Sequence, residues 1–243
     1  MTLRGVGWRA GGRSILEGVD LNIFRGERLL LLGDNGCGKT SLLRLMARLA
    51  RPTAGEIRQF IDPALGQRRG SRAWFRRVGV VYQNPNCQLF MPTVAQEVAF
   101  AAKSEGFARE IMELFDIMHL SERHPHSLSE GQKRRVSIAA VAASQPELLL
   151  LDEHTAALDP KTADKVLALS DQIVQENNLT TLMITHNMKD AIAHGNRLIM
   201  MDAGRVVVDI SGEDKKKLTV PDLLALFSRA SGSDEANDKM LLS

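Results

Sequence analysis

The sequence predicts an α/β fold in which helices cover a mainly parallel central sheet. Residues 28–33, 147–153 and 179–186 contain short, almost continuously apolar runs, and such runs are typical of strands buried on both faces. Segments with the apolar spacing of a helix, for example residues 40–50, lie between these runs along the chain. Because neighbouring parallel strands need a crossover connection, this alternation favours a parallel sheet.

The remaining strand signals are shorter or more polar. Residues 16–23, LEGVDLNI, alternate apolar and polar side chains, which predicts an early strand with one buried face. Residues 51–57 predict a turn that leads into another strand, and residues 78–83, VGVVYQ, predict a further one. Residues 197–210 predict a hairpin that turns at the central Ala-Gly pair.

A helical region interrupts this pattern of strands. From about residue 84 to 143, helical spacing dominates, most clearly at residues 93–103 and 108–120. We therefore expect a helical subdomain at about 84–143 inside one domain that covers residues 1–230. The polar segment 231–243 predicts a flexible tail.

The composition excludes several classes of protein. The 243 residues include 31 Lys and Arg and 29 Asp and Glu, and a net charge of +2 gives no reason to expect nucleic acid as a partner. The two cysteines form no CxxC pair, which excludes a disulfide framework and a four-cysteine zinc site. No apolar run reaches the roughly 18 residues of a membrane span, and the first residues lack the apolar core of a signal peptide. We expect a cytoplasmic protein that reaches a membrane only through a partner.

The stretch GDNGCGKTS directly follows the first buried strand. It fits the pattern G-x-x-x-x-G-K-S/T between a strand and a helix. The glycines let the loop wrap closely, so successive backbone N–H groups and the positive N-terminal end of the next helix face one concavity. The motif predicts a loop that binds nucleotide phosphates, rather than a glycine-rich turn without a ligand. Its residues are Gly33, Asp34, Asn35, Gly36, Cys37, Gly38, Lys39, Thr40 and Ser41.

Four side chains of this loop are expected to have distinct effects on nucleotide binding. Lys39 should reach the β- and γ-phosphates of ATP, Thr40 should give its hydroxyl to Mg²⁺, and Ser41 should assist at the phosphates. Cys37 lies inside the loop, so we expect alkylation of its thiol to block nucleotide binding by bulk.

Two carboxylates, those of Asp152 and Glu153, directly follow the apolar run LLLL at residues 148–151. Burying them near a sheet edge is costly unless a cation or a proton partner is present, so two merely exposed loop carboxylates are the weaker interpretation. Asp152 is placed to hold Mg²⁺ through water, and Glu153 is placed to polarise the attacking water as a general base.

Between the glycine-rich loop and these carboxylates, residues 128–132 read LSEGQ. This segment resembles the signature of the ATP-binding-cassette (ABC) ATPase family, which is usually LSGGQ. Other motifs of that family follow in its order: Gln83 matches the Q-loop, Asp159 in AALDP matches the D-loop, and His186 in LMITH matches the switch histidine. The resemblance extends over about residues 3–210.

The resemblance implies a P-loop NTPase fold with an antiparallel β part at the N-terminus and a helical subdomain inserted between the Q-loop and the signature. It further implies that two cassettes stack head to tail, with each ATP between one phosphate loop and the opposing signature. Because the chain carries one of each, we expect a homodimer, or a heterodimer with a second ABC ATPase.

The resemblance also assigns nucleotide contacts to the signature. Ser129 resembles a helix N-cap whose hydroxyl, with nearby N–H groups, would meet a γ-phosphate. His186 would contact the γ-phosphate, and Gln83 would sense the metal and the water. The residues that the resemblance adds to the ATP contacts are Ser129, Gly131, Gln132 and Asp159.

Three positions depart from the family pattern. Glu130 stands where the signature usually has its first glycine, and we expect its side chain to point away from the nucleotide. Ala10 stands where an aromatic side chain usually stacks on adenine, and Trp8, two residues earlier, either replaces that aromatic or packs in the core. His154 replaces the proline usual after the catalytic glutamate.

Two parts of the chain resemble transport ATPases. Residues 81–100, VYQNPNCQLFMPTVAQEVAF, resemble the region after the Q-loop in energy-coupling-factor and cobalt-type importers, where a membrane partner docks. Leu89, Phe90 and Met91 would either be exposed in that docking groove or fill the core of the subdomain. The C-terminal part resembles ATPases of a bacterial importer group thought to handle aromatic amino acids.

The sequence therefore predicts the ATP-binding and ATP-hydrolysing motor subunit of an ABC transporter. Its expected partners are a membrane-spanning permease subunit and a substrate-binding component, and its expected place is the inner face of the cell membrane. A separate ATPase chain favours import. The alternative is a soluble ABC ATPase in DNA repair, iron–sulfur assembly or translation, against which the lack of a second cassette and of zinc-ligating cysteines counts.

Overall fold

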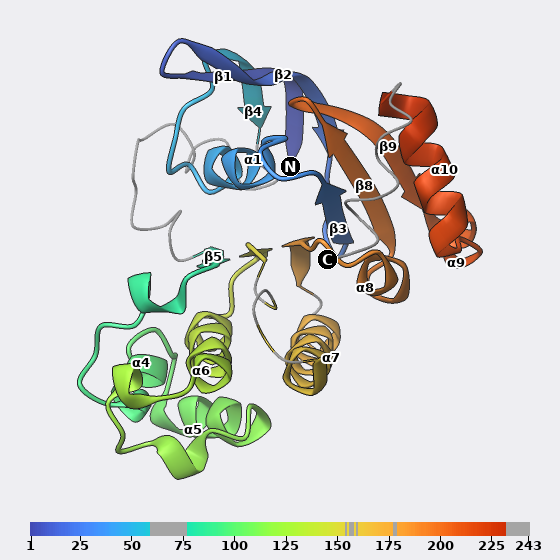
Figure 1. The fold of residues 1–243 in the computed structure, drawn as a ribbon. Coiled ribbons are helices and arrows are strands. Elements are labelled where there is room, and N and C mark those ends of the chain that lie inside the picture. The colour runs from blue at the N-terminus through green and yellow to red at the C-terminus, as the bar shows by residue number, and fades with distance from the viewer. Residues whose placement is uncertain (59–76, 154, 156–157, 159, 177–178, 232–243) are drawn as a thin grey trace. The chain divides into compact units, whose positions relative to one another are not determined.

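The chain forms two compact units in the computed structural model, Met1–Ser71 with Thr181–Ser243 and Arg72–Thr180 (Figure 1). We call them the first unit and the second unit. The structure describes residues 1–58, 77–153, 155, 158, 160–176 and 179–231.

The N-terminal part of the first unit is an antiparallel sheet with the strand order β2-β1-β4 (Figure 1). Leu16, Val19 and Leu21 are buried, whereas Glu17 and Asp20 are exposed, so the alternation that predicts a strand with one buried face is confirmed. The strands are β1 (Thr2–Ala10), β2 (Arg13–Asn22) and β4 (Ala54–Arg58).

The second sheet of the first unit is mostly parallel. Its central strand β3 pairs in parallel with β7 and with β8, and β9 pairs antiparallel with β8 through a turn at Ala203 and Gly204. Both turn residues have positive φ values, 43° and 79°, as a tight hairpin turn requires. The predicted buried strands and the hairpin are therefore confirmed. Their bounds are β3 (Arg28–Gly33), β7 (Thr180–Ile184), β8 (Arg197–Asp202) and β9 (Arg205–Ser211).

Helix α1 is shorter than the sequence predicts. It spans Lys39–Met46, whereas the apolar spacing continues to residue 50. Arg48 takes a left-handed conformation with φ 59°, and the amide of Leu49 donates back to the carbonyl of Arg44 at 2.9 Å. These are the features of a Schellman motif at the C-terminus of a helix. That motif usually has glycine at the position that Arg48 takes here, so the sequence does not indicate where the helix ends.

The C-terminal helices of the first unit are α8 (Met188–Ala193), α9 (Gly212–Lys216) and α10 (Val220–Ser231). Lys215 of α9 is buried, and its Nζ donates to the main-chain oxygens of Ile192, His194 and Gly195 at 2.8, 2.6 and 3.3 Å. Ile192 lies in the last turn of α8 and the other two residues follow the helix directly, so Lys215 caps the C-terminal end of α8. The predicted tail lies outside the described residues beyond Ser231.

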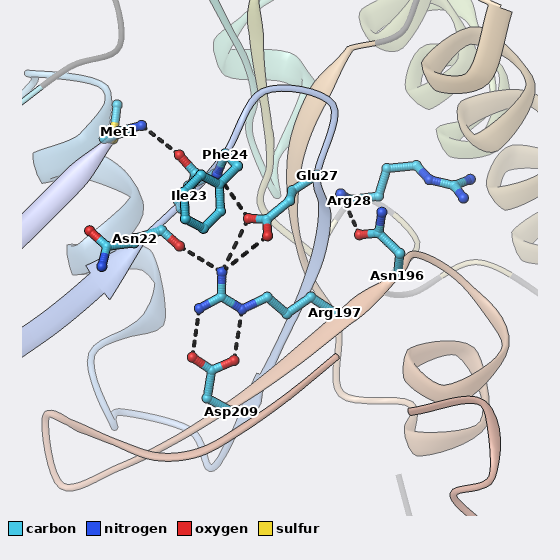
Figure 2. A network of polar contacts seen from close by, with 9 residues as sticks. All are labelled: Met1, Asn22, Ile23, Phe24, Glu27, Arg28, Asn196, Arg197 and Asp209. Carbon is cyan, nitrogen blue, oxygen red and sulfur yellow. Dashed lines mark hydrogen bonds and ion pairs between the residues drawn. The ribbon is translucent and has the colours of Figure 1, made fainter. Parts of the chain in front are cut away.

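A cluster around Arg197 fastens the start of β8 to its surroundings (Figure 2). The guanidinium contacts Asp209 through Nη2 at 2.6 Å and Glu27 through Nη1 at 3.1 Å, and Nη1 also donates to the carbonyl of Asn22 at 2.6 Å. The hydrogen bond to Asp209 is the main reason that the pKa of Arg197 is raised. The cluster joins β8, β9 and the connection between β2 and β3 at the strand ends opposite the glycine-rich loop.

The second unit combines a two-stranded parallel ribbon with helices. Strand β5 pairs with β6 in register, Val78 with Leu148 and Val81 with Leu151, so both predicted strands are confirmed. Helix α6 packs against α4, α5, α7 and β5 (Figure 1). The bounds are β5 (Val78–Val81), β6 (Leu148–Leu151), α4 (Val94–Ala99), α5 (Glu105–Leu114), α6 (Glu130–Ala143), α7 (Pro160–Glu176), and the 3₁₀ turns η1 (Pro85–Cys87), η2 (Met118–Leu120) and η3 (Pro125–Ser127).

The length of α5 also differs from the prediction. The apolar spacing runs to residue 120, but α5 ends at Leu114 because Asp116 has a left-handed φ of 52° and η2 follows. Among the described residues of both units, no helix combines the length and the apolarity needed to cross a bilayer.

Candidate functional site

The glycine-rich loop lies in the first unit between β3 and α1. A Cβ on Gly33 would clash with the main chain of Met201 and lie 2.7 Å from the sulfur of Cys37, and a Cβ on Gly38 would lie 2.9 Å from the carbonyl oxygen of Ile15. Gly36 has open space around it but a φ of 83°, which favours glycine for conformational reasons. The loop is therefore closely packed at Gly33 and Gly38, where a larger residue would not fit.

Lys39 is buried at the base of this loop. Its Nζ donates to the main-chain oxygens of Gly33 at 2.8 Å and Asp34 at 3.0 Å, so the ammonium is held by the loop itself. Helix α1 starts here, and its N-cap Gly38 offers no side-chain hydrogen bond. No side-chain cap therefore covers the start of α1, and this helix start lies beside a fixed positive charge, as an anion site requires.

The side chains of the loop differ in exposure. Asp34 and Asn35 are exposed, and Thr40 and Ser41 are half-buried. Cys37 is 6% exposed, and burial raises the pKa of its thiol. The sulfur thus packs under the loop beside Gly33, where a reagent reaches it only when the loop opens.

His186 belongs to the same unit and the same sheet edge as the loop. In the parallel pair, Leu31 of β3 is opposite Ile184 of β7, so Gly33 and His186 both lie two residues further toward the carboxyl ends. His186 is half-buried. Asn187 follows it and caps α8 by accepting the N–H groups of Lys189 and Asp190. The carboxyl edge of a parallel sheet is the usual place of a ligand site, and both predicted residues lie there.

The predicted hydrolytic residues lie together in the second unit. Val81 of β5 is opposite Leu151 of β6, which places Gln83 and Glu153 at equivalent positions beyond the two strands. The Nε2 of Gln83 donates to the Oε2 of Glu153 at 2.8 Å. Asp152 is buried, and its amide donates to the carbonyl of Val81 at 2.9 Å. Glu153 has a left-handed φ of 44°, an uncommon conformation for glutamate and one associated with functional sites.

The LSEGQ segment forms the start of α6. Ser129 is the N-cap, and its Oγ accepts the amide of Gln132 at 3.3 Å, while the Oε1 of Gln132 accepts the amide of Ser129 at 3.0 Å. This reciprocal capping box confirms that Ser129 is an N-cap. Glu130 pairs with Lys133 on the exposed side of the helix at 2.9 Å.

The apolar residues after the Q-loop divide between core and surface. Leu89 is 2% exposed, Met91 is half-buried, and Phe90 is 64% exposed. Exposure of this trio is therefore wrong for Leu89, which packs in the core, and right for Phe90. The ring of Phe90 meets the exposed ring of Phe100 edge to face, with 5.3 Å between centroids.

Two polar side chains fix the backbone of this segment. Glu97 is buried, and its Oε2 accepts the amides of Phe90 at 2.8 Å and Met91 at 2.7 Å. From η3, the Nε2 of His126 donates to the carbonyl of Leu89 at 3.1 Å. The exposed aromatic pair is thus presented by a fixed backbone, which the sequence does not reveal.

The structure distributes the predicted site over both units. The loop from Gly33 to Ser41 and His186 belong to the first unit, and the Q-loop, the two carboxylates and the signature belong to the second. Asp159 and His154 lie outside the described residues. Sequence reasoning missed Arg134, a buried side chain on α6 that contacts the Q-loop backbone. The sequence feature that could have indicated Arg134 is its helical spacing from Ile138 and Ala142, which places it on the buried face of the helix.

Among the described residues, no group of three His, Cys, Asp or Glu side chains is arranged to hold a metal ion by itself. The hydroxyl of Thr40 and the carboxylate of Asp152 have the hard oxygen chemistry that magnesium prefers.

Comparison with known proteins gives one family. Residues 16–156 match the family model described as ABC transporter. The tyrosine transport ATP-binding protein of Clostridioides difficile is 34% identical over 233 residues, which are 89% of this chain and 92% of that protein. The energy-coupling factor transporter ATP-binding protein EcfA of Methanoculleus marisnigri is 36% identical over 217 residues, 86% of this chain and 77% of that protein.

Solved structures agree with the relatives. The cbiO1 protein of Clostridium perfringens, part of the ABC transporter complex cbiONQ, superposes with a TM-score of 0.79 at 29% identity and covers 94% of both chains. The ATP-binding cassette MJ0796, solved as a dimer bound to ADP and Pi in a post-hydrolysis state, superposes with a TM-score of 0.71 at 26% identity over 86% of this chain and 97% of that chain.

Proposed function

Because this chain belongs to the ABC transporter family and is one of its ATP-hydrolysing subunits, we propose that it drives an importer through a separate membrane-spanning permease. The relatives are ATP-binding subunits of transport systems, which removes support from the alternative of a soluble ABC ATPase in repair, cluster assembly or translation. We keep the assignment of residues 1–230 to one ATPase domain with a helical subdomain at about 84–143.

The observation that carries the proposal is the loop around Lys39. An ammonium fixed at the base of the loop, at a helix start that has no side-chain cap, is a site for a polyphosphate. When ATP binds, its β- and γ-phosphates replace the carbonyls of Gly33 and Asp34 as the partners of Lys39. Thr40 and Ser41 then add hydroxyl contacts at the start of α1.

We assign hydrolysis to the residues after β5 and β6. Glu153 accepts the proton of the attacking water, and the amide of Gln83 orients the carboxylate through the 2.8 Å hydrogen bond. His186 contacts the γ-phosphate. Magnesium, when bound, would neutralise charge on the phosphates, and Thr40, Gln83 and Asp152 would hold it.

We further propose that the active form is a dimer, either of this chain or with a second cassette. One phosphate loop and one signature per chain leave each ATP half enclosed in a monomer, and the dimeric cassette structure supports this arrangement. Ser129, Gly131, Gln132 and Asp159 would contact the nucleotide held by the partner.

The docking surface for the permease, in this proposal, is the aromatic pair Phe90 and Phe100. Large aromatic side chains that are exposed on a fixed backbone are typical anchors of interfaces. Glu97 stabilises that backbone by accepting two of its amides. We also assign a substrate-binding component to the complex and place the chain at the cytoplasmic face of the cell membrane.

Purification of the chain together with a membrane-spanning permease from its host cells tests the proposal. We expect the two proteins to purify together from detergent-solubilised membranes, and the double variant Phe90→Ser/Phe100→Ser to lose the membrane subunit while it still binds MgATP. A Phe107→Ser variant, changed at a half-buried position on α5, is the matched control and should retain the complex. A wild-type chain that remains entirely free of the membrane subunit would refute the transport assignment.

A further inference from the structure

Arg134 is a buried cation whose partners are main-chain carbonyls. It lies on α6, is 4% exposed, and donates from Nη1 to the oxygen of Tyr82 at 2.7 Å and from Nη2 to the oxygen of Gln83. Within the described part of the chain it forms no ion pair, and its Nε has no hydrogen-bond partner. Burial lowers the pKa of Arg134, against the opposing effects of Glu130 and Asp152.

Such an arrangement costs stability unless it serves another purpose. A buried guanidinium loses its hydration, and two carbonyls return only part of that loss. An apolar side chain of the same volume would fill the space, but it would leave the carbonyls of Tyr82 and Gln83 without these donors. Arginine at this position therefore fixes the position of the Q-loop backbone at Tyr82 and Gln83.

The hydrogen bonds continue from this backbone to the proposed general base. Gln83 accepts from Arg134 through its main-chain oxygen and donates from its side chain to Glu153 at 2.8 Å. All three residues belong to the second unit. The direction of the Gln83 side chain depends on its backbone, so a shift of that backbone would break the contact with Glu153.

We propose that Arg134 is a positioning residue for hydrolysis, which acts by fixing the main chain of Gln83 so that its amide reaches Glu153. The inference rests on the roles proposed above for Gln83 and Glu153. Because α6 begins at the signature residue Ser129, one helix carries both the signature and the anchor of the Q-loop. A movement of α6 is thereby transmitted to the hydrolytic residues of the same chain.

The neighbouring arginine on α6 provides a matched control. Arg135 also donates to main-chain carbonyls, those of Phe115 and Asp116, both at 3.0 Å, and its side chain is largely buried. Its contacts hold the end of α5 and do not involve the Q-loop. Replacing either arginine by methionine keeps a flexible, unbranched side chain and removes the donors, so the two variants differ in which backbone they release.

The test compares Arg134→Met, Arg134→Lys and Arg135→Met in the full chain, each with and without Gln83→Ala. We measure kcat and KM for MgATP, nucleotide affinity by calorimetry, and the melting temperature. We expect Arg134→Met to lower kcat by about 10- to 100-fold with nucleotide affinity unchanged, the range seen when supports of functional ligands are removed. Arg134→Lys, which keeps the cation and one donor, should recover part of kcat.

The decisive readout is the double variant. If Arg134 acts through Gln83, Arg134→Met changes kcat less than about 2-fold once Gln83 is alanine. Arg135→Met should lower the melting temperature but not kcat. Multiplicative losses in the double variant, an equal loss of kcat in Arg135→Met, or a normal kcat in Arg134→Met would each overturn the inference. A normal kcat in Gln83→Ala alone would instead refute the role proposed for Gln83, and the inference with it.

Discussion

The two helix N-termini that were expected to meet phosphate are built in opposite ways. Helix α1 begins at Gly38, which has a φ of 106° and offers no side-chain cap. Helix α6 begins at Ser129, whose side chain and backbone are both bonded to Gln132 in a reciprocal box. At the first helix start no side-chain cap has to be displaced by a ligand, whereas at the second the amides of Ser129 and Gln132 are already bonded within the chain.

This difference separates binding from closure. A phosphate adds partners to α1 without displacing a cap, so nucleotide affinity resides in the loop and Lys39. At α6, a phosphate has to compete with the bond between Ser129 and Gln132, and an N-cap of this kind is worth about 1 kcal/mol. In the proposed dimer, we therefore expect Ser129 to contribute less to nucleotide binding than Lys39 does.

The largest expected effect is a loss of nucleotide affinity at the start of α1. Lys39→Ala removes the ammonium that the phosphates would take over, and loss of one partner from a buried charged contact costs at least about 3 kcal/mol, or about 100-fold in affinity. Calorimetric titration with MgATP measures this loss. Arg44→Ala, which removes a cation from the other end of α1, should bind as the wild type does. Equal affinity in the Lys39 variant would remove the loop from its role.

The next largest effect is a loss of ATP hydrolysis in a variant that still binds MgATP. Glu153→Gln keeps shape and hydrogen bonding but removes the base, so hydrolysis should fall by about 10²- to 10⁴-fold while MgATP still binds. Gel filtration with ATP should then show an accumulated dimer. Glu147→Gln, at the opposite end of β6, is the control and should hydrolyse ATP normally. A Glu153→Gln variant with normal turnover would show that another group accepts the proton.

A smaller effect is expected at the capped start of α6. Ser129→Ala removes the cap of α6 and should lower the free energy of unfolding by about 1 kcal/mol. Ser104→Ala removes an equivalent cap from α5, where Ser104 accepts the amide of Phe107 at 3.2 Å, and should cost a similar amount. Only the Ser129 variant should also lose ATPase activity. If both variants keep full activity, Ser129 acts as a cap alone.

The smallest effect is kinetic and concerns the two thiols. Cys87 is exposed, whereas Cys37 is buried with a raised pKa, so less of Cys37 is thiolate at any given pH. In a Cys87→Ser variant, iodoacetamide should modify Cys37 slowly at pH 7, faster as the pH rises, and more slowly with bound MgATP. Mass spectrometry follows the modification. A Cys37 that reacts as fast at pH 7 as Cys87 does in the wild type would contradict the buried position of its sulfur.

Much of the fold could be predicted because its strands have strong local signals. Continuous apolar runs predicted β3, β6 and β7, and the Ala-Gly pair predicted the hairpin of β8 and β9. The end of α1 could not be predicted, because Arg48 takes the left-handed position where a glycine would have been recognised. Sequence patterns thus predicted the elements in which each residue has a conformation that its type commonly adopts.

The site was predictable in its motifs but not in its supports. Glycines, hydroxyls and carboxylates at fixed spacings predicted Lys39 and Glu153, and the resemblance to ABC ATPases predicted His186. Phe90 and Leu89 are adjacent and both apolar, and only the tertiary contacts with Glu97 and His126 decide which of them is buried. Arg134 was hidden for the same reason, since a cation in a charged run usually faces water.

The lysine that caps α8 matters for building chimeric subunits from this chain. The run Lys215–Lys217 resembles a solvated linker, and the end of β9 would be the natural place to exchange modules with a relative. A cut there would remove the ammonium from the carbonyls of Ile192, His194 and Gly195, and α8, the helix that follows His186, would fray. A safe splice point therefore lies after α9, so that each graft carries its own α9 lysine.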